Sequence, residues 1–409
     1  MRTANIFLWA LLAAMPAKAQ DFRTDINPAL RYYEGFILNG DMAQADRDYL
    51  FTNEWRGQEL PPRFGELIAG FDKQFKLARQ AAQATVPCDW GIDLSPGPAT
   101  LLPHLARCKQ LAITAQLRAL WDLQNGKESE ARDDLLATFA LARNCSHDGT
   151  LIGVLVDFAD QALVMASVVG NFGRFSTQTL EQLDEGFSTA PAPLTIADAF
   201  ANEEKMCFTG WLERKIAAWQ KESGGDDAKV LAKVREVIMP EENGTNAWEN
   251  IMKEGGTSDA ILKMLRDQEE LYDKSVALIS LPYPEFIGQT NRFAAEVEAV
   301  KAANPLAALT FPDPVKAEKK EFRSQAWLAM FHAAVAYKSR GLPGLNSVND
   351  PFGQGPFRFE RFSLDGVDRG FKLTSAYTGS GFPEALIFVE VEGKPFRCDG
   401  PSIGTAIPK

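Results

Sequence analysis

Along most of the chain, apolar side chains recur at every third or fourth position, the spacing that lines one face of an α-helix. The clearest pattern spans residues 103–124, and a second one spans residues 128–145. Asn125-Gly126 separates them, and these residue types readily adopt the left-handed backbone that follows a last helical turn. We therefore predict an antiparallel helical hairpin. Its stripe of mostly small residues comprises Leu105, Cys108, Ala112, Ala115 and Ala119, then Ala131, Leu135, Thr138, Ala142 and Cys145.

Two cysteines occupy matching positions in this predicted hairpin. Residues at equal distances from Gly126 lie side by side, which places Cys108 opposite Cys145. Small neighbours would let the helices approach closely, and a disulfide needs Cα atoms within about 7 Å. We therefore predict a Cys108–Cys145 disulfide; the alternative is that both are small buried residues, a common role of cysteine. The pairing of Cys88, Cys207 and Cys398 stays open.

The remaining patterns set the fold class. Helical spacing also occurs at 28–38, 63–83, 150–172, 195–222, 259–279, 284–304 and 315–341, whereas the polar, glycine-containing stretch 240–257 predicts a loop crossing. After Gly341 the chain becomes rich in Gly, Pro and Phe, and short alternating runs at 358–363, 370–376 and 385–391 predict strands. We expect a mainly α protein of stacked antiparallel helical hairpins with a small C-terminal β appendage.

The N-terminus has the features of a secretory signal peptide. Arg2 precedes an apolar run at 6–15, and Ala17-Lys18-Ala19 supplies an A-x-A cleavage site. The alternative is a buried N-terminal helix. We predict cleavage after Ala19, a periplasmic or secreted protein, and no membrane span in the mature chain. The expected division is a signal peptide at 1–19, a helical domain at 20–340 and a small β-containing segment at 341–409.

Charge and composition narrow the classes of partner. The chain carries a net charge of −11, and an acidic surface disfavours nucleic acid and anionic lipid, which need basic patches. The expected partners are an envelope protein, a peptide or a glycan, with no nucleic acid. The sequence contains none of the HExxH, GxSxG, phosphate-loop or GxGxxG motifs. We therefore expect no cofactor and no metal, and a binding protein more readily than an enzyme.

Two local resemblances bear on the fold. Residues 123–142 resemble one tetratricopeptide-type helical hairpin, without a second copy at the same period. Residues 349–359, NDPFGQGPFRF, resemble the element that closes the major pseudopilins of type II secretion. A similar tail, with an NPA-type start such as residues 27–29, looks to be shared by uncharacterised families of exported helical bacterial proteins. That resemblance implies a fold but no activity.

The pseudopilin resemblance does not carry over every property of that family. The chain lacks the N-terminal pilin helix, and residues 378–382, TGSGF, stand where pseudopilins have an acidic calcium-binding loop. Calcium binding and pilus assembly are therefore not expected.

The candidate chemistry is sparse. By the equal-distance rule, His104 and His147 lie near the same end of the hairpin as the two cysteines, which suggests either a metal or Cys–His site or simply two helix-end histidines. Carboxylates such as Glu203 and Glu204 can serve glycoside chemistry when two lie about 5 to 9 Å apart, but neighbouring acids on a helix are commonly solvated.

Two functional hypotheses follow. The leading one is a non-enzymatic, exported binding or scaffold protein of the cell envelope, with a groove between hairpins. The alternative is an extracytoplasmic hydrolase or lyase acting on polysaccharide. A concave cleft lined by tryptophans and carboxylates would favour the enzyme, and a shallow polar groove the binder. For Trp90 the alternative is a purely structural role, in which its ring plugs the top of the hairpin stack. The candidate groove residues are Asp89, Trp90, Trp121, Glu203 and Glu204.

Overall fold

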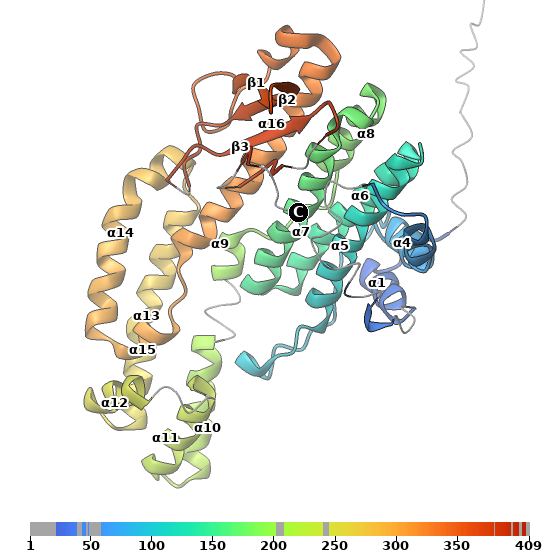
Figure 1. Ribbon diagram of the computed structural model, residues 1–409. Helices are drawn as coiled ribbons and strands as arrows, with labels where there is room; N and C mark the ends of the chain where they lie inside the picture. The colour runs from blue at the N-terminus through green and yellow to red at the C-terminus, as the bar shows by residue number, and fades with distance from the viewer. Residues whose placement is uncertain are drawn as a thin grey trace, which may run out of the picture.

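A computed structural model of the chain describes residues 22–38, 43–45, 48, 59–201, 208–239, 245–379, 381–393, 396–400 and 403–405. The predicted signal peptide and its cleavage site lie outside these residues. The described chain is mostly helical, with one three-stranded antiparallel sheet near the C-terminus (Figure 1). The predicted fold class is therefore confirmed.

The helices and strands have the following bounds. Within the described residues the helices begin with α1 (Pro28–Ile37), α3 (Arg63–Ala69), α4 (Asp72–Ala81), α5 (Pro103–Gln124), α6 (Glu128–Cys145), α7 (Leu151–Gly170), α8 (Thr177–Ser188), α9 (Ile196–Ala199) and α10 (Gly210–Glu222). They are followed by α11 (Asp227–Ile238), α12 (Thr245–Lys253), α13 (Ser258–Ile279), α14 (Tyr283–Ala303), α15 (Pro305–Thr310) and α16 (Pro314–Leu345). The strands are β1 (Arg358–Leu364), β2 (Val367–Thr374) and β3 (Ala385–Val389).

Helices α5 and α6 form the predicted antiparallel hairpin. Proline at the first position of α5 needs no backbone N–H there, and Gly126 takes the left-handed backbone at φ 72° that the tight turn requires. Ala112, Ala115 and Ala119 of α5 are completely buried, because their small side chains face the neighbouring helices. The hairpin follows from the sequence pattern.

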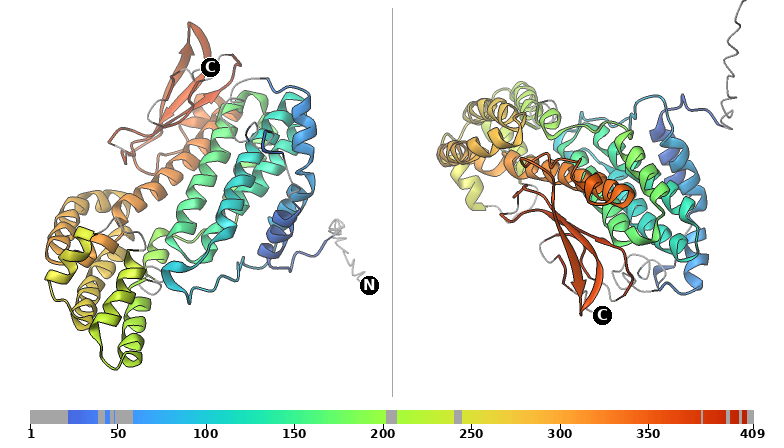
Figure 2. Two further views of the ribbon diagram at one scale, coloured as in Figure 1. Left: turned by 60° about the horizontal axis from the view of Figure 1, so that its bottom comes forward. Right: turned by 90° about the horizontal axis from the view of Figure 1, so that it is seen from above.

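Helix α7 packs against both α5 and α6, with α4 and α1 on one side of this bundle and α8 and α16 on the other (Figures 1 and 2). By length and composition alone α7 could cross a membrane, and it is the one described helix for which this holds. Here 61% of its most apolar window is buried inside the protein. The apolar composition of α7 is therefore explained by its central position in the main hydrophobic core.

Helices α10 to α13 and α15 form an arm with its own hydrophobic cluster. Trp211 of α10 ties the arm to the body, because its indole Nε1 donates to the Ser95 carbonyl over 2.8 Å. Gly97 lies directly on the Trp211 ring, where an added Cβ would come within 2.4 Å of a ring carbon. The loop predicted at 240–257 is wrong over residues 245–253, where α12 forms. Ile251 is completely buried there, since Trp248, Ile251 and Met252 share one helical face of the cluster.

The sheet has the order β1-β2-β3 and packs on the end of α7 and on α16. Phe371 of β2 stacks on Phe388 of β3 at 5.0 Å, and both meet the Phe172 ring edge-on. The strands begin or end within three residues of the predicted runs.

Residues 349–359 fasten this sheet through a buried carboxylate. The Asp350 carboxylate, 5% exposed, accepts hydrogen bonds from the backbone N–H groups of Phe352 at 3.0 Å and Ala376 at 2.5 Å. The Ser375 hydroxyl donates to the same carboxylate at 2.9 Å. One buried acid thus joins the segment to the end of β2.

Candidate functional site

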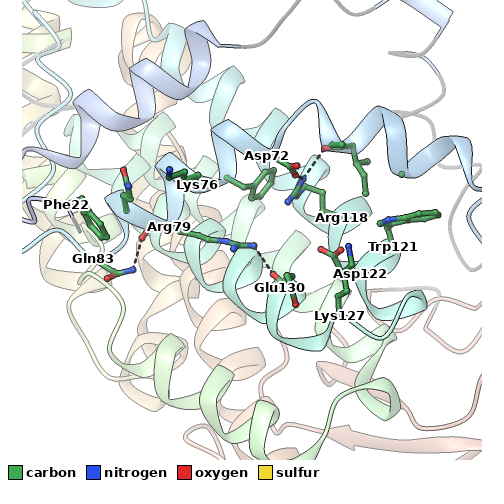
Figure 3. A pocket seen from close by; sticks show the side chains of 15 residues that line it. Phe22, Asp72, Lys76, Arg79, Gln83, Arg118, Trp121, Asp122, Lys127 and Glu130 are labelled. Carbon is green, nitrogen blue, oxygen red and sulfur yellow. Dashed lines mark hydrogen bonds and ion pairs between the residues drawn. The ribbon is translucent and has the colours of Figure 1, made fainter. Parts of the chain in front are cut away.

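A cavity of about 670 Å³ lies where α3 and α4 cross the α5–α6 hairpin. We call it the α4 groove. Figure 3 shows Phe22 and Gln83 at one end and Trp121 at the other, with Arg79 and Arg118 between them. Its full lining is Phe22, Gly65, Ile68, Ala69, Asp72, Phe75, Lys76, Arg79, Gln80, Gln83, Arg118, Trp121, Asp122, Lys127 and Glu130.

Arg118 of α5 lies at the centre of the groove. Only 8% of the residue is exposed, and its guanidinium lies over the Phe75 ring at 4.6 Å. Nε donates to Asp134 over 2.8 Å, and Nη1 donates to Asp72 over 2.6 Å and to the Ile68 carbonyl over 3.0 Å. Burial lowers the pKa of Arg118, but these two carboxylates outweigh burial and raise it, so the guanidinium stays charged.

Asp134 of α6 holds two arginines at once. Its side chain is fully buried, and its second oxygen lies 2.6 Å from Nη2 of Arg79, which comes from α4. Arg79 also donates to the Glu130 carbonyl over 3.3 Å. A buried carboxylate between two guanidinium groups ties α4 to the hairpin and shapes the groove floor.

Asp122 is the most chemically distinctive group in the groove. The residue is 7% exposed, and its carboxylate has no hydrogen-bond or ion-pair partner within the described part of the chain. Burial raises its pKa to about 6, although the charges of Arg118 and Lys127 oppose the shift. A carboxyl that titrates near neutral pH inside a cavity is a typical functional group.

Trp121 forms the end wall of the groove. Its ring packs beside Phe64 with centroids 6.3 Å apart. Gly65 of α3 lies under the indole, and an added Cβ would come within 2.5 Å of Cζ2. The glycine therefore sets the depth of this end.

The predicted groove residues do not all gather here. Trp121 lines the groove, but Trp90 does not: it is 3% exposed, donates to the Asn144 carbonyl over 2.7 Å and stacks on His104 at 4.6 Å. That position matches its alternative role as a plug between helices. Asp89 is exposed and accepts from the Gly91 N–H over 2.8 Å. Glu203 and Glu204 lie outside the described residues.

Sequence reasoning missed the charged residues of the groove. Arg118 and Asp122 are four residues apart on one helix, and Asp134 lies near Ala119 by the equal-distance rule. Their position beside the apolar stripe of the hairpin was the sequence feature that could have indicated burial of these charged residues. The sequence did not indicate Arg79, since it comes from another helix.

The two cysteines lie side by side, and His104 lies at the same end of the hairpin through its contact with Asp148, next to His147 in the chain. Cys108 and Cys145 are completely buried free thiols whose side chains interact with each other, and the disulfide between them stays a prediction. His104 Nε2 lies 3.1 Å from Asp148, and His147 Nε2 donates to the Ala192 carbonyl over 2.8 Å. No group of three metal-ligating side chains suited to a metal ion occurs among the described residues.

Comparison with known proteins finds no matching family model, no similar curated protein and no similar solved structure. The candidate site therefore rests on its own geometry and chemistry.

Proposed function

We propose that this chain is an exported protein that binds a short peptide, or a peptide-like component of the cell envelope, in the α4 groove. The groove supports this proposal because it is elongated, has an aromatic ring at each end, and carries charges of both signs between them. Pockets of about 300–1,000 Å³ suit small-molecule ligands, and the α4 groove falls in that range.

The balance of charge points to a ligand with both an amine and a carboxylate. Arg79 and Arg118 are already neutralised by Asp134 and Asp72. The lining charges without an ion-pair partner among the described residues are two cations and two anions: Lys76, Lys127, Asp122 and Glu130. A peptide offers groups of both signs, whereas a neutral glycan would leave all four without an ionic partner.

One observation favours the alternative, a hydrolase or lyase acting on polysaccharide. Asp122, with a pKa of about 6, lies beside Trp121 in a concave cleft. A carboxyl with a raised pKa is the usual general acid of glycoside hydrolysis, where a second carboxyl acts opposite it. Asp72 and Glu130 are the other acids of the lining.

Calorimetric titration of the purified protein with trialanine and with chitotetraose separates the two functions. We expect trialanine to bind, and Asp122→Asn to weaken it about tenfold, since a hydrogen bond to a charged group contributes about 1.5–3 kcal/mol. Asp267→Asn is the matched control, because Asp267 lies on the arm surface, where it pairs with Lys263. Release of new reducing ends from chitotetraose that Asp122→Asn abolishes, without trialanine binding, would instead establish the enzyme.

A further inference from the structure

A second cavity, separate from the α4 groove, lies between α7 and α16. Its volume is about 230 Å³, and no residue lines both cavities. Helices α7 and α16 pack directly against each other, and α6 contributes Phe139 to the wall. Nothing in the proposed peptide-binding function requires this cavity.

The walls of this α7–α16 cavity are mostly apolar. Phe139, Phe158 and Met165 are at most 8% exposed, and all three belong to the main core. Trp327 of α16 closes one side, and its indole Nε1 donates to Glu384 over 3.1 Å. An apolar molecule in this cavity would make extensive contact with these apolar side chains.

The polar side chains of the lining either form hydrogen bonds or ion pairs within the protein or carry a positive charge. Ser324 donates to Gln161 Oε1 over 2.7 Å, and Gln161 Nε2 donates to Asp157 over 2.5 Å. Arg323 pairs with Glu384 at 3.2 Å. Lys320, exposed on α16, is the lining charge left without an ion-pair partner among the described residues.

We infer that the α7–α16 cavity binds a free medium-chain fatty acid. Its alkyl chain would lie against Phe139, Phe158 and Met165, and its carboxylate would pair with Lys320 beside Arg323. An apolar interior with an unneutralised cation and no acidic lining residue complements an amphiphilic anion. The volume is below the roughly 300–1,000 Å³ of pockets for drug-sized ligands, which favours a medium-chain acid over a long-chain one.

Sodium octanoate is the probe, and octanol is its neutral counterpart. Titration calorimetry should show octanoate binding at least about fivefold tighter than octanol, because only the acid can pair with Lys320. Lys320→Gln should weaken octanoate about tenfold and leave octanol unchanged. Lys316→Gln is the matched control, one turn earlier on α16 and outside the lining.

Two variants that fill the cavity test its location. Ala162→Trp and Ala159→Trp each place an indole in the lining, and Ala159 is exposed, so that its replacement spares the core. We expect both to abolish octanoate binding, and Ala159→Trp to leave the thermal unfolding midpoint near that of the parent. Octanoate binding that survives in a folded Ala159→Trp protein, equal affinity for octanol, or no binding to the parent chain would overturn the inference.

Discussion

The buried carboxyl of Asp157 allows a quantitative test of the core. Asp157 lies on α7 with no exposed surface, and its Oδ1 accepts from Gln161 Nε2. Its Oδ2 has no hydrogen-bond partner within the part of the chain that the structure describes. Burial raises the pKa of Asp157 from 3.8 to about 7, against the opposing charge of Arg143.

The raised pKa sets the sign and size of a pH effect. As the pH rises from about 4, the unfolded chain loses this proton first, while the folded chain holds it until about pH 7. The contribution of Asp157 to folding stability therefore falls over this window and levels off above it. A shift of about three pKa units corresponds to about 4 kcal/mol. Asp157→Asn cannot ionise, so its stability relative to the parent should rise by up to about 4 kcal/mol from pH 4 to pH 8.

Urea denaturation followed by circular dichroism at pH 4, 6 and 8 measures this difference. Glu318, whose pKa burial and Glu321 raise to about 9, should contribute a similar slope to both proteins, because Asp157 is not among the groups that shift it. Asp267→Asn, at an exposed helix position, should run parallel to the parent at every pH. If the Asp157→Asn profile also runs parallel within about 1 kcal/mol, then Asp157 is not held protonated by burial and the reasoning fails.

Three further predictions concern the groove and the hairpin. Asp134→Asn should lower the free energy of unfolding by about 3 kcal/mol, because it leaves Arg118 with Asp72 alone; a loss below about 1 kcal/mol in urea titrations would contradict this. Trialanine should bind about tenfold tighter at pH 7 than at pH 5, since ionised Asp122 pairs with its amine, and calorimetry of Asp122→Asn should show no such rise. In protein secreted to an oxidising compartment and unfolded without reductant, Cys108 and Cys145 should resist maleimide labelling; labelling of both would exclude the disulfide.

The sequence by itself determined the local architecture of the chain. The hairpin of α5 and α6 follows from apolar spacing and from Asn125-Gly126, because helix periodicity and turn preference depend on neighbouring residues. The same spacing placed Cys108 beside Cys145, since one turn sets the register of an antiparallel pair. The three short strands follow from alternation in the same way. Export and the division of the chain remain predictions that rest on the sequence alone.

Only the tertiary structure determines which polar residues are buried and which of them line the candidate site. Arg79 and Asp134 are 55 positions apart, and the sequence does not indicate that α4 crosses the hairpin where the two meet. Asp122 looks like a surface acid on a helix until the groove buries it and raises its pKa. Trp90, predicted in the groove, instead fills the space beside His104. Burial and charge pairing depend on atoms brought together from distant segments, so they emerge only when the helices pack.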